Sequence, residues 1–207
     1  MRKVFIDGGA NKGQSTKKFL SVWPDSDQYE IFMFEPNSKA PWISGKKTNL
    51  IRKALWIYDG EIDFYEKQPN SEANTILKEK TNLSKAKFKK HTVKCISLSK
   101  WVLNNFTKKD HIVLKLDVEG AEYEIIKDLY NNECLQFIDI MFCEIHGLKC
   151  GKSYDESLEL IKLCNSSNLN IYNWNADTFA YDTYELDMYD EQFLKKEHKK
   201  WEKRGLK

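Results

Sequence analysis

Three charged residues alternate at the end of an apolar segment in the second half of the sequence. Lys115, Asp117 and Glu119 occupy every second position where the run His111–Leu116 ends. Alternate side chains of an extended strand point the same way, so these three share one side while the chain stays extended. Isolated charges in a buried strand are costly. The pattern indicates either catalytic groups or structural ones. In the structural case Lys115 pairs with an acid, and Glu119 favours the start of the next helix.

A second apolar segment, Phe137–Cys143, is followed by Glu144 and His146. We expect this strand to lie beside the first, so that the charged residues of both meet at one rim. Carboxylates and an imidazole placed together can act as a general base or hold a hard metal ion, and the near-neutral pKa of histidine suits the first role. The predicted catalytic residues are Lys115, Asp117, Glu119, Glu144 and His146, and the metal alternative places Mg²⁺ or Ca²⁺ on Asp117, Glu144 and His146.

A glycine-rich turn follows the first apolar run, Val4–Ile6. A dinucleotide fingerprint needs glycine where this chain has Ala10, and a phosphate-binding loop needs lysine where it has Gln14. Two interpretations of the turn are left: it holds no ligand, or it binds S-adenosylmethionine. In the second case Asp7 offers a carboxylate to the ammonium group of the ligand, and backbone amides face its carboxylate. The contacts predicted in this turn are Asp7, Gly8, Gly9, Ala10, Asn11, Gly13, Gln14 and Ser15.

An acid also ends the second predicted strand, Tyr29–Phe34. In open α/β sheets ligands bind beyond the carboxyl ends of the strands, so Glu35 faces the same crevice as the glycine turn. Its carboxylate can accept hydrogen bonds from ribose hydroxyls; the alternative is an acid that only starts a loop. The contacts predicted here are Glu35, Pro36 and Asn37, and Asn37 either touches the adenosine or caps the next segment.

Strands that alternate with helices must position these groups. Further strands are expected within Thr48–Trp56 and at Glu61–Tyr65 (a hairpin arm), Thr92–Ile96, Leu169–Trp174 and Thr178–Tyr184, the last of them antiparallel. Helices are expected at Lys100–Asn105, capped by Ser97 or Ser99, and at Glu119–Tyr130, Ser157–Ser166 and Asp190–Lys207. The alternation predicts an α/β fold with a mostly parallel sheet and helices on both faces.

Composition narrows the class of protein. The 207 residues fit a single domain, 1–207, and the net charge of +2 is too small to indicate a nucleic-acid partner. The lysine-rich stretch Gln68–Lys90 is expected to be a mobile loop with at most a short helix, and the charged tail 190–207 a solvated helix face. Five cysteines without a C-x-x-C pair indicate a reducing compartment. No leader and no 18-residue apolar run is present, so we expect a cytoplasmic protein without a membrane span.

Together these segments resemble the FkbM family of S-adenosylmethionine-dependent methyltransferases. The resemblance spans Val4 to about His146, and the phrase K-L-D-V-E-G-A-E is its most specific part. It implies a Rossmann-like class I methyltransferase fold, with a seven-stranded sheet whose last strand is antiparallel. It also implies O-methylation, often of sugars or of hydroxyls of secondary metabolites. The matching segments are FIDGGANKGQS (5–15), FEPN (34–37), KALWIYDGEIDFY (53–65), LKLDVEGAEYEIIKDL (114–129) and CEIH (143–146).

The resemblance also implies roles for single residues. Glu35 would hold the ribose, Ala54 and Leu55 would flank the adenine, and Asp117 would lie beside the sulfonium and the acceptor. The residues that would hold the methionine part are Asp7, Gly8, Gly9, Asn11 and Gly13. An acceptor cleft at Tyr65, Asn70, Asn74 and Trp174 is suggested by their positions near strand ends.

The function predicted from the sequence is O-methylation of a hydroxyl on a sugar, a glycan or a similar small polyol. His146 or Asp117 would act as base, oriented by Glu144 or Glu119. The alternatives are an RNA methyltransferase on the same fold, a nucleotide-dependent oxidoreductase, which Ala10 disfavours, and a non-catalytic nucleotide-binding domain, which has no need of the acids. The sequence leaves the acceptor and the oligomeric state open.

Overall fold

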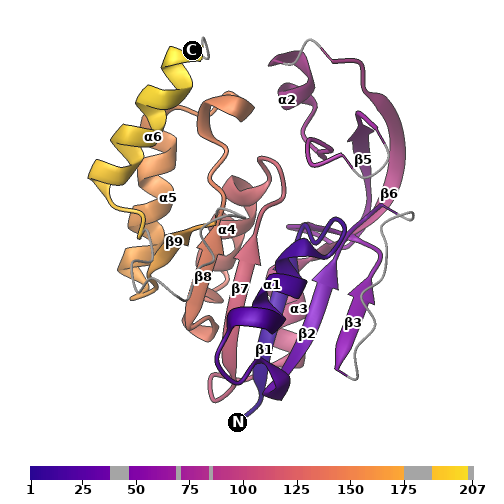
Figure 1. Ribbon diagram of the computed structural model, residues 1–207, viewed down its shortest axis with the longest axis vertical. Helices are drawn as coiled ribbons and strands as arrows, with labels where there is room; N and C mark the ends of the chain where they lie inside the picture. Colours follow the sequence, from indigo (N-terminus) through magenta and orange to yellow (C-terminus); the bar gives the residue numbers. More distant parts are fainter. Residues whose placement is uncertain (38–46, 69–70, 84–85, 175–187, 205–207) are drawn as a thin grey trace.

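The computed structural model of the chain describes residues 1–37, 47–68, 71–83, 86–174 and 188–204. Within these residues, six parallel strands form a central sheet (Figure 1). In spatial order the strands are β3 (Thr48–Ile51), β2 (Tyr29–Phe34), β1 (Lys3–Gly8), β7 (His111–Leu116), β8 (Ile140–Cys143) and β9 (Ile171–Asn173).

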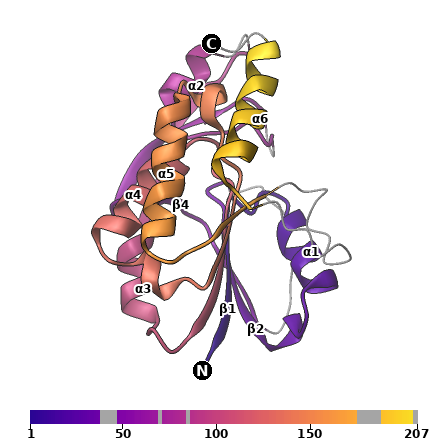
Figure 2. The same ribbon diagram turned by 90° about the vertical axis from the view of Figure 1, so that its left-hand side faces the viewer.

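Helices cover both faces of this sheet, as Figure 2 shows: α1 packs on one face, and α3, α4 and α5 pack on the other. The strands serve both faces because their side chains alternate. On β1, Phe5 stacks on Phe19 of α1 at 4.0 Å between ring centroids, whereas Val4 and Ile6 join the core on the opposite face. The α-helices are α1 (Gln14–Val22), α2 (Lys78–Leu83), α3 (Leu98–Asn105), α4 (Glu122–Asn131), α5 (Tyr154–Ser166) and α6 (Glu191–Lys203).

Local sequence signals account for where several helices begin. The Ser97 hydroxyl accepts a hydrogen bond from the amide of Lys100 and so caps α3, which decides between the two serines expected there. At the start of α5, Ser153 and Glu156 form a reciprocal capping box. Three short 3₁₀ turns complete the described helical structure: η1 (Ser26–Gln28), η2 (Leu135–Phe137) and η3 (Gly147–Cys150).

The order of the strands places a topological switch point between β1 and β7. From β1 the chain builds outward through β2 and β3, and it then returns to the other side of β1 with β7, β8 and β9. In doubly wound sheets ligands bind at the carboxyl ends of the strands beside such a switch point. The residues that follow β1, β2, β7 and β8 are therefore the ones to examine for a site.

A second, three-stranded sheet lies above the carboxyl end of the central one (Figure 1). Its middle strand β6 (Lys89–Ser97) pairs in parallel with β4 (Ala54–Trp56) and antiparallel with β5 (Gly60–Glu66). The alternating run at 61–65 was expected as a hairpin arm. In the structure it is an antiparallel strand that pairs with β6. The region expected as one strand, Thr48–Trp56, is divided between two sheets, because Arg52 and Lys53 separate β3 from β4.

The predicted α/β class and the mostly parallel sheet with helices on both faces are confirmed. The number of strands differs: seven were expected, and the described residues contain six in the central sheet. The expected antiparallel strand, Thr178–Tyr184, lies outside the described residues. Beside β9 there is one antiparallel bridge, between Tyr172 and Met188.

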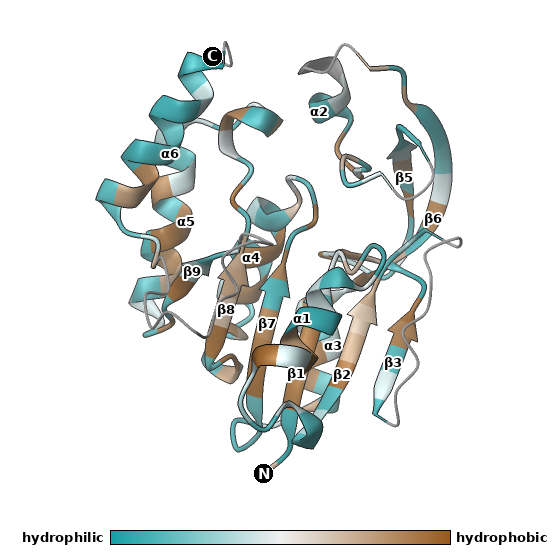
Figure 3. Ribbon diagram, viewed as in Figure 1, coloured by the Kyte–Doolittle hydropathy of each residue, from teal (hydrophilic) through white to brown (hydrophobic). Residues whose placement is uncertain are grey.

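The helix α6 packs against α5 and η3 through Leu194 and Trp201, and its outer face is hydrophilic (Figure 3). Figure 3 also shows apolar residues gathered on the central strands. None of the described helices combines the length and the apolar character needed to cross a bilayer. All five cysteines of the chain lie in its described part, where they are buried and unpaired.

Candidate functional site

A cavity of about 340 Å³ lies where β1, β2, β7 and β8 end. Small-ligand sites have volumes of about 300–1,000 Å³, and this cavity falls within that range. The predicted residues that line it are Gly9, Asn11, Gln14, Ser15, Glu35, Pro36, Asn37, Ala54, Leu55, Lys115, Asp117, Glu119 and Glu144. Five other residues predicted to be catalytic or to bind the cofactor are described and lie outside the lining: Asp7, Gly8, Ala10, Gly13 and His146.

The glycine turn is fixed against its neighbours by backbone contacts. The amides of Gly9 and Ala10 both donate to the Phe34 carbonyl at 3.1 Å, and the Asp117 amide donates to the Gly8 carbonyl at 3.1 Å. Gly9 has a φ of +74°, and a Cβ at this position would stand 1.9 Å from the Asp117 carbonyl oxygen. Only glycine allows the turn to pass so close to the end of β7.

Behind the turn, Lys115 is buried with 1% of its surface exposed. Its ammonium lies 3.3 Å from Asp7 Oδ1 and 3.5 Å from Asp117 Oδ2, and it donates to the carbonyls of Gly8 and Gly9 at 3.2 and 3.0 Å. Burial alone would lower the pKa of Lys115, but the charges of Asp7 and Asp117 outweigh it and raise the pKa. Lys115 thus ties the turn to the carboxyl end of β7.

Asp7 is fully buried and lies on the inner side of the turn. Its Oδ2 accepts hydrogen bonds from the hydroxyls of Ser15 and Thr16 at 2.5 and 2.7 Å, while Oδ1 faces Lys115. The carboxylate is therefore occupied by groups of the protein. In this arrangement Asp7 shapes the turn from behind, and Gly9, Asn11, Gln14 and Ser15 form the surface that faces the cavity.

Glu35 is buried at the end of β2, and both of its oxygens accept from backbone amides. Oε2 accepts from Asn11 at 2.9 Å and Oε1 accepts from Asn37 at 2.8 Å. Burial raises the pKa of this carboxyl, and the two amides oppose the rise only in part. Each carboxylate oxygen has further acceptor capacity, so Glu35 can still receive hydroxyl donors from a ligand in the cavity.

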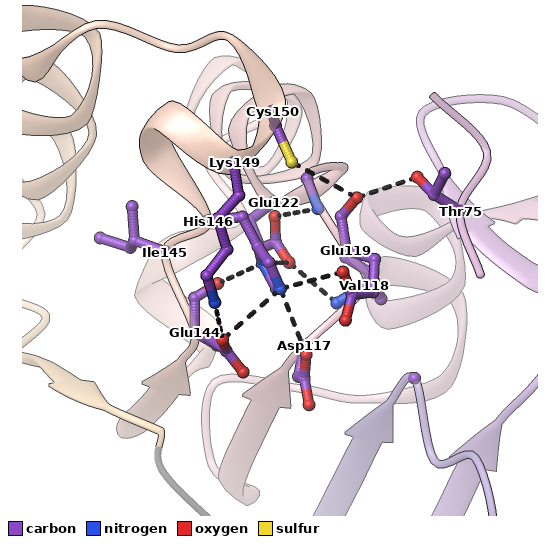
Figure 4. Close-up of polar contacts among 12 residues, drawn as sticks. Thr75, Asp117, Val118, Glu119, Glu122, Glu144, Ile145, His146, Lys149 and Cys150 are labelled. Carbon is purple, nitrogen blue, oxygen red and sulfur yellow. Dashed lines mark hydrogen bonds and ion pairs between the residues drawn. The ribbon is translucent and has the colours of Figure 1, made fainter. Parts of the chain in front are cut away.

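The second part of the site is a group of five side chains, here called the His146 cluster: His146, Asp117, Glu119, Glu122 and Glu144 (Figure 4). His146 is 1% exposed and lies among the four carboxylates. Its Nδ1 lies 3.1 Å from Glu122 Oε1, and its Nε2 faces Glu119 Oε2 at 3.2 Å, Glu144 Oε1 at 3.6 Å and Asp117 Oδ1 at 3.9 Å. The rim predicted from the two strand ends therefore exists, with the imidazole at its centre.

A tight turn between β7 and α4 carries part of this cluster. Glu119 has a φ of +59°, unusual for a residue with a side chain, and Gly120 follows with +106°. Glu122 holds the turn by accepting from the amides of Val118 and Gly120, each at 2.8 Å. Thr75 Oγ1 donates to the Glu119 carbonyl at 2.9 Å, so the segment before α2 also supports the turn.

The members of the cluster alter one another's pKa. Burial raises the pKa of Asp117 against the opposing charges of Lys115 and His146. Burial acts in the same direction on Glu144, but the charges of His146 and Lys149 outweigh it and lower the pKa. Burial would lower the pKa of His146, yet its acidic neighbours, Glu122 first, raise it. The cluster therefore favours a positive charge at the position of the imidazole.

Lysines from outside the cluster balance its acids. Lys149 Nζ lies 2.9 Å from Glu144 Oε1, and Lys80 of α2 pairs with the carboxylate of Glu119. Burial lowers the pKa of Lys80. One oxygen each of Asp117 and Glu122 and one nitrogen of His146 lie within 4.8 Å of one another, a grouping that could hold a metal ion.

Sequence reasoning missed Glu122, Thr75, Lys80 and Lys149. Glu122 carried a detectable signal, since it is an acid in the first turn of a helix whose other inward positions are apolar. The three others come from segments without a recognisable pattern, and only the fold brings them to the site. Of the expected acceptor residues, Asn74 and Trp174 line the cavity, Tyr65 lies outside the lining, and Asn70 is not among the described residues.

Comparison with known proteins gives a family match. The family model described as the methyltransferase FkbM domain matches residues 7–169, which include the predicted catalytic and cofactor-binding residues and extend from the end of β1 past α5. The helix α6 lies beyond the matched range. No curated protein and no solved structure matches the chain.

Proposed function

Since this chain belongs to the FkbM methyltransferase family, we propose that it transfers a methyl group from S-adenosylmethionine to a hydroxyl of a sugar, a glycan or a similar small polyol. The observation that carries this proposal is that the glycine turn, Glu35 and Asp117 line one and the same cavity. One end of that cavity offers backbone groups and a buried carboxylate, and the other offers ionisable side chains. A cofactor and an acceptor can therefore lie next to each other.

The cavity residues can be matched to the parts of S-adenosylmethionine in turn. The turn at Gly9 and Asn11 would hold the amino-acid end, and Glu35 would accept hydrogen bonds from the ribose. Ala54 and Leu55, both buried and apolar, would pack on the adenine. The match between these residues and the ligand rests on the hydrogen-bond donors and acceptors that line the cavity. Asp7 contributes from behind by holding Ser15 and Lys115.

When bound, S-adenosylmethionine supplies a methyl group on a positively charged sulfur, so the protein has to provide orientation and a proton acceptor. Asp117 is the group best placed to take the acceptor proton, because it lines the cavity and its side chain is partly exposed. His146 lies behind the cavity wall and acts on the site through its acidic neighbours. The Asp117 carboxylate would take the hydroxyl proton as the acceptor oxygen attacks the methyl carbon.

Further residues of the cavity lining suit a polyhydroxylated acceptor. Trp174 adds an aromatic side chain to the lining, and Ser71, Glu72 and Asn74 offer hydrogen-bonding groups from the loop before α2. Sugars are commonly held by this combination, in which the ring stacks and the hydroxyls are bonded individually. We therefore favour a sugar or glycan hydroxyl as the acceptor.

Calorimetry with S-adenosylhomocysteine, run beside NAD and ATP, tests the proposal. We expect micromolar binding of S-adenosylhomocysteine alone, weakened by Glu35→Ala. The matched control is Glu30→Ala, which removes an acid from the same strand at a position where it pairs with Arg2 away from the cavity. Absence of binding to folded protein, or equal loss in both variants, would refute the assignment. Release of S-adenosylhomocysteine in the presence of a panel of sugars, with RNA as the rival substrate, then identifies the acceptor class.

A further inference from the structure

We propose that the His146 cluster binds one divalent transition-metal ion of the Mn²⁺ class, with His146 Nε2 and the carboxylates of Asp117, Glu119 and Glu144 as ligands. The binding itself stands on the geometry of the cluster. Its part in catalysis rests on the function proposed above.

The first argument is the state of the imidazole. Nδ1 lies 3.1 Å from Glu122 Oε1 and 3.0 Å from the Glu144 carbonyl oxygen, and both of these atoms are acceptors. Nδ1 therefore carries a proton. The other nitrogen, Nε2, is buried and makes no hydrogen bond within the described part of the chain. Nε2 is thus the nitrogen whose lone pair a cation can use: its acidic neighbours favour a positive charge here, and a metal ion can take the place of the proton.

The second argument is what this lone pair faces. Nε2 is 3.2 Å from Glu119 Oε2, 3.6 Å from Glu144 Oε1 and 3.9 Å from Asp117 Oδ1 (Figure 4). Three carboxylate oxygens around one ring nitrogen repel one another unless a positive charge lies among them, and a divalent ion bound through Nε2 can supply that charge in place of a proton. Atoms that share one ion at about 2.0–2.2 Å lie about 3–3.5 Å apart, so small movements of the side chains would complete the shell.

The third argument is the support behind the imidazole. Histidine ligands of metals usually donate their second ring N–H to a carboxylate, which fixes the tautomer and the orientation of the ring. Glu122 does this here, and it is itself held by the amides of Val118 and Gly120. The lone pair of Nε2 is thus aimed by a chain of contacts that reaches the backbone of α4 and the turn before it.

The ligand types select the class of ion. Carboxylates suit Mg²⁺, Ca²⁺ and Mn²⁺, whereas an imidazole nitrogen favours transition metals. A set with one imidazole and several carboxylates therefore favours Mn²⁺ over the Mg²⁺ or Ca²⁺ that the acids alone suggest.

The position of the ion would connect the cluster to the cavity. Asp117, Glu119 and Glu144 line the cavity, while His146 closes the cluster from behind. An ion held there would leave coordination positions open on the cavity side, and it would make a contacting acceptor hydroxyl more acidic. Asp117 could bind through Oδ1 and still take the proton on Oδ2.

Lys80 provides an internal competitor for the ion. Its ammonium pairs with the Glu119 carboxylate, one of the proposed ligands. A metal must displace this contact, so removal of the Lys80 charge should tighten metal binding. A surface acidic patch that attracts cations without specificity would lack both the dependence on His146 and this competition.

Titration of the purified apo-protein with MnCl₂, followed by the electron paramagnetic resonance signal of free Mn²⁺, tests the proposal. We expect one ion per chain, with Mg²⁺ and Ca²⁺ displacing it poorly. His146→Gln should weaken Mn²⁺ binding by about 10- to 100-fold or more, and Lys80→Gln should strengthen it. The matched control is His111→Gln, because His111 also pairs with an acid, Asp139, but at the opposite end of β7.

Glu144→Gln provides a second test in case His146→Gln does not fold. The Glu144 side chain is 34% exposed, and its replacement leaves the buried imidazole in place. It too should weaken Mn²⁺ binding. If wild-type protein binds S-adenosylhomocysteine but no Mn²⁺, the metal site is refuted while the methyltransferase proposal stands. Equal Mn²⁺ affinity in wild type, His146→Gln and Glu144→Gln would refute it as well.

Discussion

Lys115 and Asp7 form an ion pair inside the sheet, with Nζ 3.3 Å from Oδ1. The two residues are direct neighbours in the register of β1 and β7, and both side chains are buried. The same ammonium holds two carbonyls of the glycine turn and faces Asp117. One buried cation thus connects the cofactor side of the cavity to the proposed base.

Replacement of Lys115 by methionine tests this connection. The variant leaves the Asp7 carboxylate buried without its counter-charge, which typically destabilises a protein by about 3–5 kcal/mol. We expect a loss of that size in the free energy of unfolding, measured with denaturant. The double variant Asp7→Asn, Lys115→Met removes both charges and should recover part of the loss. A cost below about 1 kcal/mol for Lys115→Met, the range of exposed ion pairs, would show that the pair is not buried as described.

Gly9→Ala should disturb both folding and the site. The added Cβ would stand 1.9 Å from the Asp117 carbonyl oxygen, and the φ of +74° disfavours any side chain. The backbone strain alone costs about 1–3 kcal/mol, and the overlap adds to it. Gly60→Ala is the control, since Gly60 also has a positive φ but its nearest neighbouring atom is 3.8 Å from the added Cβ. Equal unfolding midpoints for the two variants would contradict the close approach.

Binding of S-adenosylhomocysteine should depend on pH through Glu35. Burial raises the pKa of this carboxyl, so it becomes protonated at a higher pH than an ordinary glutamate. The protonated form has lost acceptor capacity for ribose hydroxyls, and affinity should therefore fall as the pH decreases through the raised pKa. Calorimetry over a range of pH checks this. Glu35→Gln should bind more weakly and lose the pH dependence; an unchanged pH profile in that variant would exclude Glu35 as its source.

Asp117→Asn should separate chemistry from cofactor binding. The amide cannot accept the acceptor proton, and loss of general base catalysis lowers turnover by about 10²–10⁴-fold. Affinity for S-adenosylhomocysteine should change little, because this product carries no sulfonium charge. Turnover and calorimetry on the same preparation measure both quantities. Asp63→Asn serves as the control, since Asp63 pairs with Lys90 on the antiparallel arm. Full turnover in Asp117→Asn would show that another residue acts as the base.

Much of this site could be predicted because its signals are local. The glycine turn, the acid that ends β2 and the charges that end β7 and β8 each follow an apolar strand, and parallel strands bring their carboxyl ends together. The alternation of Lys115 with apolar residues also indicated an acidic partner. The identity of that partner depends on a register between residues more than 100 positions apart, and no local pattern encodes it.

Other features depend on packing that the sequence does not display. The sequence marks Glu122 as an acid among the apolar inward positions of a helix but does not give its partner, because the contact with His146 exists only once α4 lies beside the end of β8. The region Thr48–Trp56 was expected as one strand candidate because it carries Leu50, Ile51, Ala54 and Leu55. Its division between two sheets follows from the bend at Arg52 and Lys53, which carries the chain from the edge of the central sheet to β6.

The helix α6 offers a last test, of a part of the fold that lies outside the family match. Trp201 is 6% exposed and covers Gly147, where an added Cβ would stand 2.0 Å from the indole ring. Gly147 directly follows His146, so α6 covers the turn next to the cluster. Trp201→Ala should cost about 3–5 kcal/mol of unfolding free energy, as large aromatic deletions in cores do, while Leu103→Ala, at a position that is 42% exposed on α3, should cost far less. Denaturant unfolding of the two variants decides the matter: similar midpoints would mean that α6 is a loosely attached tail, whereas a large difference would make it part of the folded core.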